Sequence, residues 1–535
     1  MNRNHLFLAL LSGVLISLSW FNFPTALLNL IAFVPLLVIE QKVKNNSDSL
    51  RSIILYSSIT FFTWSLLTTW WIYNAALIGL IAALFVNTFT MTFTFSMYHW
   101  VRKKSMYKIS PYSLILWWLA FEYFMLFAEI DYPWLHLGNS FATVTPLIQW
   151  YEITGILGGT LLILFTNISV VQLYANYRLN TKKINLYQIL GTVLIPLLLF
   201  IFSYITYVQH SEKGETIEVV VVQPNIDPYN EKFNNLSDQE QLNRFFNLAK
   251  DKITPNTDLI IGPETAITEY LWENQIAEQM SPKAIKSFLK QYPKAAILIG
   301  ASTRKIYGQN ETIPHSARRF NDTAIYYDRF NTGLLFDSTD IQIHHKSKLV
   351  VGVEKMPYPQ YMKFIESISL DLGGTIGSLG IQDSPTVFIH KNAKIAPVIC
   401  YESVFGEYVS EYVKKGANVI SIITNDGWWG NTPGYKQHLN YAKLRAIENR
   451  RSIARSANTG ISCFINQRGD IFEDTKWWKP DVIRATLTLN EHVTFYTKHG
   501  DFLGRIACYF SVLIFIYSIV IGITSRKQNK KKLAP

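Results

Sequence analysis

Residues 394–406, KIAPVICYESVFG, contain the side chain best suited to nucleophilic chemistry, Cys400. A short apolar run precedes this cysteine and helical spacing follows over residues 402–415, which predicts a strand that turns into a helix at the thiol. The N–H groups of a helix N-terminus lower a thiol's pKa and can bind an oxyanion. Taken alone, Cys400 is better explained as a buried and inert cysteine, because free cysteines are often buried.

Two other predicted strand ends carry groups that would complete such a site. Residues 258–264, DLIIGPE, end in Glu264, and residues 344–354, HHKSKLVVGVE, place Lys346 and Lys348 before an apolar run. A carboxylate, a lysine and a cysteine provide a base, a cation for an oxyanion, and a nucleophile. Singly, the carboxylate is explained by a buried salt bridge and the lysines by a solvated pair on a strand edge. Their combination favours a nucleophilic site.

The composition divides the chain into parts. Its 535 residues exceed the usual size of one domain, and 49% of them are hydrophobic. Residues 1–208 and 506–524 are nearly continuous apolar runs, whereas residues 209–505 have the composition of a soluble domain. The net charge of the whole chain is +11, but the 34 basic and 33 acidic residues of 209–505 nearly cancel. A basic face for nucleic acid is therefore not expected.

The three cysteines, Cys400, Cys463 and Cys508, form neither a disulfide framework nor the spacing of a metal site, and no metal or cofactor is expected. Cys463 alternates like a strand residue and is expected in a core. Cys508 falls in the last apolar run, where we expect it to pack.

Eight apolar runs predict membrane spans, which need about 20 residues each: 6–19, 27–39, 53–72, 76–97, 113–127, 155–173, 187–207 and 506–523. In this eight-span arrangement, the connecting loops that carry Lys or Arg all lie on one side. The positive-inside rule then places both termini in the cytoplasm and residues 209–505 outside. Glu122 lies inside the fifth run, as the only midspan acid we identify, and is either a functional group or a packing residue.

Residues 209–505 alternate between strand and helix patterns. Apolar runs such as 217–222, 395–399 and 419–424 are typical of buried strands. Helical spacing recurs between such runs, for example over residues 237–253, 282–292 and 435–456. This alternation predicts an α/β layered domain with a buried sheet.

The local motifs resemble those of the nitrilase superfamily, whose Glu-Lys-Cys triad makes and breaks acyl thioesters. PE at Glu264, KSKLV at 346–350 and CYE at 400–402 carry this resemblance. Eight spans with a nitrilase-like domain between the seventh and eighth are similar to the apolipoprotein N-acyltransferase family of the bacterial inner membrane. QPNI at 223–226 and TNDGWWG at 424–430 also fit that family.

The resemblance implies a role for each matching residue. Glu264 would be the base, Lys346 the stabilising cation and Cys400 the nucleophile. Glu402, next to the nucleophile, would tune or orient the base.

Three other positions match the family less directly. Glu354 and Tyr401, like Glu402, correspond to residues on which the family's activity depends. Phe233 would represent an aromatic residue, typically Trp, that follows the QxNI strand and binds substrate.

The same resemblance implies an α-β-β-α sandwich joined to the helical bundle. Residues 1–208 would hold seven spans, residues 209–505 a periplasmic catalytic domain, and residues 506–535 the eighth span and a basic cytoplasmic tail. Phospholipid would donate an acyl chain to the N-terminal diacylglyceryl-cysteine of lipoproteins through a thioester. The enzyme would act as a monomer in the inner membrane and need no cofactor.

Two positions depart from the family pattern. Lys348 stands where the family usually has His, and His344 stands where it usually has Tyr. We prefer Lys346 as the catalytic lysine because it keeps the family's eight-residue spacing to Glu354.

Two other classes of protein remain possible on the sequence. A membrane-tethered amidase would use the same triad with water as the acyl acceptor. A transporter or receptor would make the triad accidental, and such a protein would carry several midspan charges.

Overall fold

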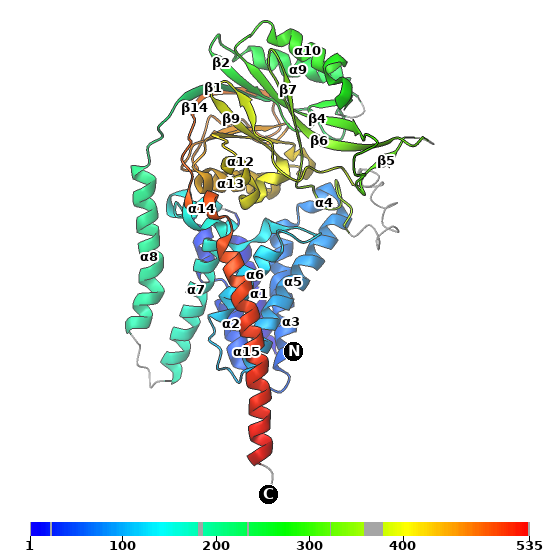
Figure 1. The fold of residues 1–535 in the computed structure, drawn as a ribbon. Coiled ribbons are helices and arrows are strands. Elements are labelled where there is room, and N and C mark those ends of the chain that lie inside the picture. Colours follow the sequence, from blue (N-terminus) through cyan, green and yellow to red (C-terminus); the bar gives the residue numbers. More distant parts are fainter. Residues whose placement is uncertain are drawn as a thin grey trace. The chain divides into compact units, whose positions relative to one another are not determined.

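A computed structural model describes residues 2–21, 24–179, 186–232, 235–320, 323–357 and 378–532. The chain divides into two compact units (Figure 1). The helical unit comprises Met1–Tyr73, Leu77–Gln209 and His499–Pro535, and the α/β unit comprises Asn74–Ala76 and His210–Lys498. The boundaries between the two units thus lie close to the positions where the apolar composition ends, near residue 209, and resumes, near residue 506.

Apolar helices make up the helical unit. They are α1 (Arg3–Leu18), α2 (Val34–Val43), α3 (Ser49–Thr69), α4 (Ile72–Ala75), α5 (Leu77–Lys104), α6 (Ser113–Phe124), α7 (Tyr151–Leu179), α8 (Leu186–Gln209) and α15 (Phe502–Lys532). Short 3-10 helices add η1 (Thr25–Leu30), η2 (Pro133–Leu135), η3 (Leu137–Thr143) and η4 (Thr145–Leu147). Every predicted span coincides with a helix.

Within the described ranges, six helical segments are long and apolar enough to cross a membrane: Thr25–Val43, Ser49–Thr69, Leu77–Lys104, Tyr151–Tyr177, Leu186–Gln209 and Phe502–Thr524. The helices α1 and α6 are apolar but have only 16 and 12 residues, short of the roughly 20 that a span requires. The α6 helix ends at Phe124, and turns and bends lead from there to the 3-10 helix η2. Membrane-spanning helices are therefore supported, but the count of eight is not.

Glu40 is a buried acid within the apolar segment Thr25–Val43, so Glu122 is not the only acid buried in such a segment. Glu40 of α2 is only 2% exposed and accepts hydrogen bonds from Arg102 Nη1, at 3.0 Å, and pairs with His99 Nδ1, at 3.1 Å. The sequence reasoning missed Glu40 because it lies one residue beyond the predicted run 27–39. Its ion pair with Arg102 compensates part of the cost of burying it.

Two β-sheets form the centre of the α/β unit. The larger sheet has the order β14-β1-β2-β4-β6-β5, with β3 beside β4 and β7 beside β6. Its strands are β1 (Thr216–Gln223), β2 (Thr257–Ile261), β3 (Ile267–Trp272), β4 (Ala296–Ile306), β5 (Arg318–Arg319), β6 (Tyr326–Phe336), β7 (Ile341–His345) and β14 (Asp481–Thr488). The smaller sheet has the order β13-β12-β11-β10-β9-β8. Its strands are β8 (Phe388–His390), β9 (Ala393–Ile399), β10 (Val419–Thr424), β11 (Ile453–Ala457), β12 (Cys463–Ile465) and β13 (Ile471–Phe472).

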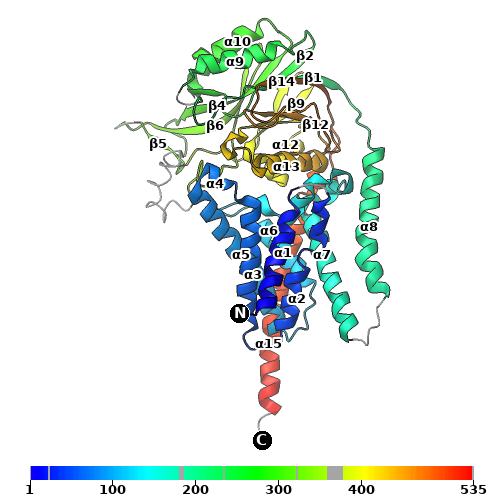
Figure 2. The same cartoon turned by 180° about the vertical axis from the view of Figure 1, so that it is seen from behind.

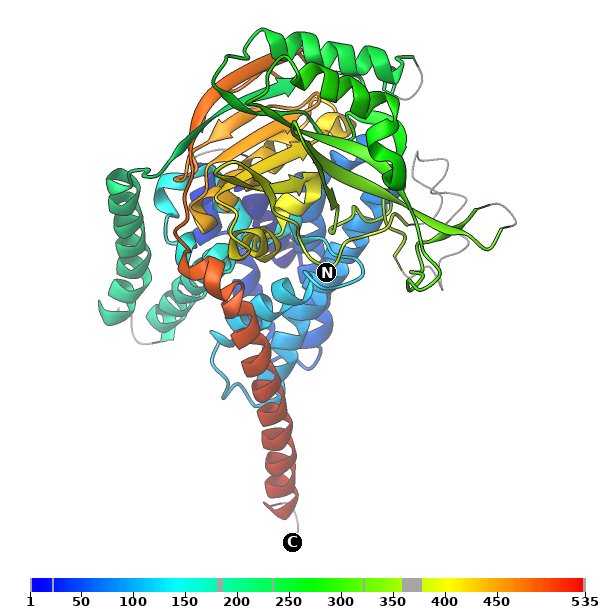
Figure 3. The same ribbon diagram turned by 45° about the horizontal axis from the view of Figure 1, so that its top comes forward.

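The two sheets pack face to face and helices cover their outer faces (Figures 2 and 3). Val219 and Val221 of the larger sheet meet Ile395 and Ile423 of the smaller one in a single apolar core. The helices α9 (Asp238–Lys250) and α10 (Met280–Leu289) cover the larger sheet, and α12 (Gly406–Lys414) and α13 (Pro433–Asn449) cover the smaller one. Four layers result, as predicted for an α/β sandwich.

The parallel strands bring several chain segments to one edge of each sheet. The strands β1, β2 and β4 are parallel neighbours, and so are β9, β10 and β11. The carboxyl ends of parallel neighbours meet at the same edge. Glu264 follows β2 and Cys400 follows β9, so the sheet order rather than the sequence determines which side chains meet.

The bounds of two predicted helices differ most from those in the structure. The predicted helix 435–456 ends at Asn449, because Arg450 takes the left-handed conformation with φ 48°. The residues after it form β11, which is buried along its whole length and therefore lacks the alternation of a half-exposed strand. The predicted helix 402–415 begins only at Gly406, after a 3-10 turn, η7 (Cys400–Val404).

Candidate active site

Cys400 stands at a sharp turn directly after β9. Its φ of 50° lies in the left-handed region, which costs a residue other than glycine about 1–2 kcal/mol. The carbonyl oxygen of Cys400 accepts a hydrogen bond from Ser403 Oγ at 2.7 Å and lies 3.2 Å from His438 Nε2. These contacts hold the turn in place. The thiol therefore begins a 3-10 turn, not the regular helix that the sequence predicted.

Glu264 lies three residues after β2 and is only 6% exposed. Its Oε1 accepts hydrogen bonds from Lys346 Nζ, at 2.9 Å, and Asn331 Nδ2, at 2.8 Å. Its Oε2 accepts from the backbone N–H of Asn425, at 3.1 Å. A Cβ on Gly300 of β4 would overlap the backbone of residues 264 and 265, so this close packing requires glycine.

Lys346 follows β7 directly and is only 1% exposed. Besides Glu264, its Nζ contacts Glu354 Oε2 at 2.9 Å. Asn331 Nδ2 joins the two carboxylates, because it also donates to Glu354 Oε1 at 2.8 Å. In contrast, Lys348 directs its Nζ over the ring of Phe405, 5.0 Å from the centroid. Of the two lysines that the sequence offered, Lys346 is the one beside Glu264.

Charge and burial set the protonation states of the three groups. Burial raises the pKa of Glu264, but the Lys346 ammonium and further hydrogen bonds outweigh it and hold that pKa below its ordinary value. Burial lowers the pKa of Lys346, but the Glu264 and Glu354 carboxylates raise it well above its ordinary value. Burial and the Glu264 charge raise the pKa of Cys400 against the opposing effect of Lys346. The resting site thus holds an ion pair beside a protonated thiol.

Glu402 connects the nucleophile turn to the lysine segment. Its side chain is fully buried and accepts hydrogen bonds from the backbone N–H groups of Ile399, at 2.8 Å, and Ser347, at 2.6 Å. Burial raises the pKa of Glu402, but neighbouring His344 and these N–H groups lower it below its ordinary value. In this arrangement Glu402 holds the backbone on either side of the site.

The structure brings most of the predicted site residues together. Glu264, Lys346 and Glu354 form one ion-paired cluster whose charges act on Cys400. Tyr401 is 7% exposed and packs edge-on against Phe405 at 5.2 Å. Phe233 lies outside the described residues. Cys463 lies in the core between the smaller sheet and its helices, as predicted, and burial raises its pKa to about 12.

A cluster of buried polar residues that supports the turn at Cys400 was not identified from the sequence. Asp426 accepts hydrogen bonds from Thr424, at 2.8 Å, and Arg455, at 2.6 Å, and pairs with His438 Nδ1 at 2.9 Å. Because His438 also contacts the Cys400 carbonyl, this group supports the turn. Asp426 falls within the TNDGWWG motif, which was the available signal. Asn331 and Lys232, both near Glu264, carried no motif.

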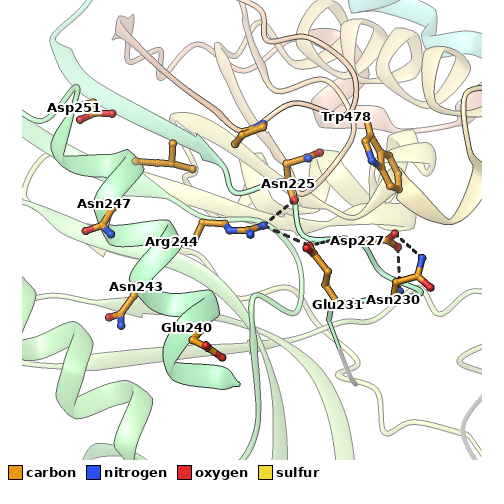
Figure 4. A pocket seen from close by; sticks show the side chains of 12 residues that line it. Asn225, Asp227, Asn230, Glu231, Glu240, Asn243, Arg244, Asn247, Asp251 and Trp478 are labelled. Carbon is orange, nitrogen blue, oxygen red and sulfur yellow. Dashed lines mark hydrogen bonds and ion pairs between the residues drawn. The ribbon is translucent and has the colours of Figure 1, made fainter. Parts of the chain in front are cut away.

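A separate hollow lies beside the loop that follows β1 (Figure 4). Its volume is about 1030 Å³, and Asn225, Asp227, Arg244 and Trp478 are among the residues that line it. Arg244 reaches across it to the carbonyl oxygen of Asn225, at 3.2 Å, and to Glu231, at 3.5 Å. The hollow is open, and most of the residues that line it are polar or charged.

Comparison with known families agrees with this geometry. Residues 218–494, more than half of the chain, match the model of the carbon-nitrogen hydrolases. The chain belongs to the carbon-nitrogen hydrolase family. Residues 12–169 match the model of the apolipoprotein N-acyltransferase N-terminal domain. The predicted family resemblance is therefore confirmed for both parts of the chain.

Full-length relatives carry the same combination of domains. An apolipoprotein N-acyltransferase of Chlorobaculum tepidum is 28% identical over 94% of this chain and 94% of its own length. Proteins of the same name from Geobacter metallireducens and Thermotoga maritima are 25% and 24% identical, over 93% and 98% of this chain and 92% and 95% of their own. Together with the two family matches, these relatives support an N-acyltransferase.

Proposed function

We propose that this protein transfers an acyl chain from a phospholipid to the N-terminal amine of diacylglyceryl-modified lipoproteins, through a thioester on Cys400. The observation that carries the proposal is the strained turn at Cys400 beside the buried Glu264–Lys346 ion pair. The apolar helices support a membrane substrate, and the names of the relatives support a lipoprotein acceptor.

The first half-reaction forms the thioester. Because the Cys400 thiol is protonated at rest, Glu264 takes its proton as the sulfur attacks the ester carbon of the phospholipid. The Lys346 ammonium stabilises the oxyanion, together with the backbone N–H of Tyr401. The carbon–oxygen bond then breaks, and the leaving alkoxide takes the proton from Glu264 to give a lysophospholipid.

The second half-reaction transfers the acyl chain to nitrogen. The neutral α-amine of the lipoprotein attacks the thioester carbon and loses a proton to Glu264. The carbon–sulfur bond breaks, and the thiolate takes that proton back from Glu264. Glu354 keeps Lys346 in place throughout, because its carboxylate binds the same ammonium as the base.

We also propose the arrangement in the membrane that the loop charges favour. Eight spans would place both termini in the cytoplasm and residues 209–505 in the periplasm of the bacterial inner membrane, with α1 and α6 completed by flanking residues. The protein would act as a monomer. A fusion of alkaline phosphatase after Pro535 is expected to be inactive and a fluorescent-protein fusion there to fluoresce. The reverse result would exclude this topology.

The acyl-enzyme is the direct test of the function. The intact mass of the purified full-length protein, incubated with phospholipid vesicles, is expected to increase by one fatty-acyl group, located on the Cys400 peptide. Cys400→Ala should abolish this adduct, whereas Cys463→Ala, a matched buried cysteine, should retain it. Adding a diacylglyceryl-modified peptide should discharge the adduct to the peptide. Discharge only to water would favour the alternative of a membrane-tethered amidase, and absence of any adduct would refute the thioester.

A further inference from the structure

Lys232 places a second ammonium group at the backbone of the base. Its side chain is only 2% exposed, and its Nζ donates to Thr265 Oγ1 at 2.6 Å and to the carbonyl oxygen of Glu264 at 3.3 Å. Burying a lysine is costly unless its charge is compensated. Burial lowers the pKa of Lys232 to about 8, and the negative charge of the Glu264 carboxylate partly compensates this effect.

The segment that carries Lys232 is itself fixed. The Lys232 N–H donates to the Asp227 carbonyl at 2.9 Å, and its own carbonyl accepts from Gln241 Nε2 of α9 at 2.8 Å. Arg244, one turn along the same helix, binds the preceding loop through the Asn225 carbonyl (Figure 4). Hydrogen bonds to the turn and to α9 therefore fix the backbone that carries the Lys232 side chain.

The backbone that Lys232 contacts is strained. Thr265, directly after the base, has φ 48°, which is unfavourable for a β-branched residue. The Lys232 ammonium donates one hydrogen bond to the Thr265 hydroxyl and another to the preceding carbonyl, and these bonds offset the strain. Strained positions persist only where their surroundings hold them, and they concentrate at functional sites.

We propose that Lys232 is a positioning residue for Glu264, which fixes the strained backbone at Thr265 and places a second positive charge beside the carboxylate. This inference rests on the role of Glu264 as base in the proposed function. It adds a residue to the catalytic centre that none of the sequence motifs indicated.

The charge of Lys232 has a predictable effect on the base. The charged and titratable groups that face Glu264 are Lys346, Lys232 and the Cys400 thiol, and Glu354 shares Lys346 with it. Both lysines lower the pKa of Glu264. Removing one positive charge raises that pKa, so the base becomes protonated at a higher pH. An opposite charge nearby typically shifts a carboxyl pKa by about one unit or more.

The test follows alkylation of Cys400 by iodoacetamide as a function of pH, in the full-length protein and without any lipid. The rate is quantified on the Cys400 peptide by mass spectrometry. The midpoint of its low-pH limb reports the protonation of Glu264, because the thiol gives its proton to that group. In Lys232→Met this midpoint should rise by about one pH unit, and Lys232→Arg, which keeps the charge, should restore it.

A matched control separates this effect from the loss of any other lysine whose pKa is lowered by burial. Lys443 of α13 has a pKa that burial lowers to about 8, as in Lys232, but its Nζ donates to Asn440 Oδ1 at 3.1 Å. Lys443→Met should leave the midpoint unchanged. An unshifted midpoint in Lys232→Met, or an equal shift in Lys443→Met, would overturn the proposal.

A second variant covers the case of a folding defect, and the choice of alkylation separates this test from that of the proposed function. If Lys232→Met does not fold, Lys232→Gln retains a donor for Thr265 while removing the charge, and the same upward shift is expected. Because alkylation needs no acyl donor, the outcome is independent of acyl transfer. A shifted midpoint in a protein that forms no acyl adduct would refute the proposed function and leave the role of Lys232 standing.

Discussion

Two buried carboxylates, Glu122 in the helical unit and Glu264 in the α/β unit, accept hydrogen bonds in different ways. Glu122 is 1% exposed and accepts from Trp118 Nε1, the backbone N–H of Leu137 and Thr160 Oγ1, at 3.1, 2.8 and 2.7 Å. These donors are all neutral. Glu264 accepts from two neutral donors and from the ammonium of Lys346.

The difference indicates what each carboxylate does. The bonds of Glu122 join α6 to η3 and α7, so they fix the irregular segment that follows α6. The bonds of Glu264 join segments that follow β2, β7 and β10, and they add a cation whose field reaches the thiol of Cys400. A buried acid with neutral donors is satisfied as a structural group, whereas one paired to a cation and facing a thiol is suited to moving a proton. Of the two alternatives for Glu122, packing is thus the better supported.

The largest predicted effect is the loss of reaction rate when the cation beside Glu264, Lys346, is removed. Lys346→Ala should lower the rate of acyl-adduct formation on Cys400 about 10²- to 10³-fold, the usual loss of an oxyanion donor. Lys348→Ala is the matched control two residues away, and it should reduce the rate only slightly because Lys348 lies over Phe405. The measurement is single-turnover mass spectrometry of the adduct.

If the two variants ranked in the opposite order, a different lysine would be catalytic. If Lys348→Ala lost the adduct while Lys346→Ala formed it at the normal rate, the catalytic lysine would be Lys348. The cluster of Lys346 with Glu264 and Glu354 would then be structural, like that of Glu122.

The sequence predicted what depends on short segments. The apolar runs gave the helices, and the strand ends gave Glu264, Lys346 and Cys400, because each of these signals is contained in about ten residues. The strand β11 was missed for a physical reason: it is buried on both faces, and its apolar spacing continues that of the preceding helix. Only the left-handed turn at Arg450 separates the two, and such a turn at a residue other than glycine has no sequence signature.

The supporting residues of the site were beyond prediction. Asn331 lies in the middle of β6 and reaches Glu264 and Glu354 only because β6 pairs with β4 and β7. Lys232 stands 32 residues before Glu264, with a helix between them. These contacts depend on the strand order of the larger sheet, which the alternation of strands and helices does not specify.

The smallest effect is expected at Glu122, and it distinguishes packing from function. Glu122→Gln keeps an oxygen for Trp118 and Leu137, and its new N–H groups can donate to Thr160, so the free energy of unfolding should fall by less than about 1 kcal/mol. Glu122→Ala leaves buried donors unsatisfied and should cost about 2–4 kcal/mol, since each orphaned group costs roughly 1–3 kcal/mol. Thermal unfolding of the two variants in detergent measures this difference.

The folded fraction of both should form the Cys400 adduct at the wild-type rate, because the bonds of Glu122 lie within the helical unit. A Glu122→Gln protein that is as stable as wild type but forms no adduct would contradict this, and would show that a buried acid with only neutral donors can also take part in the reaction.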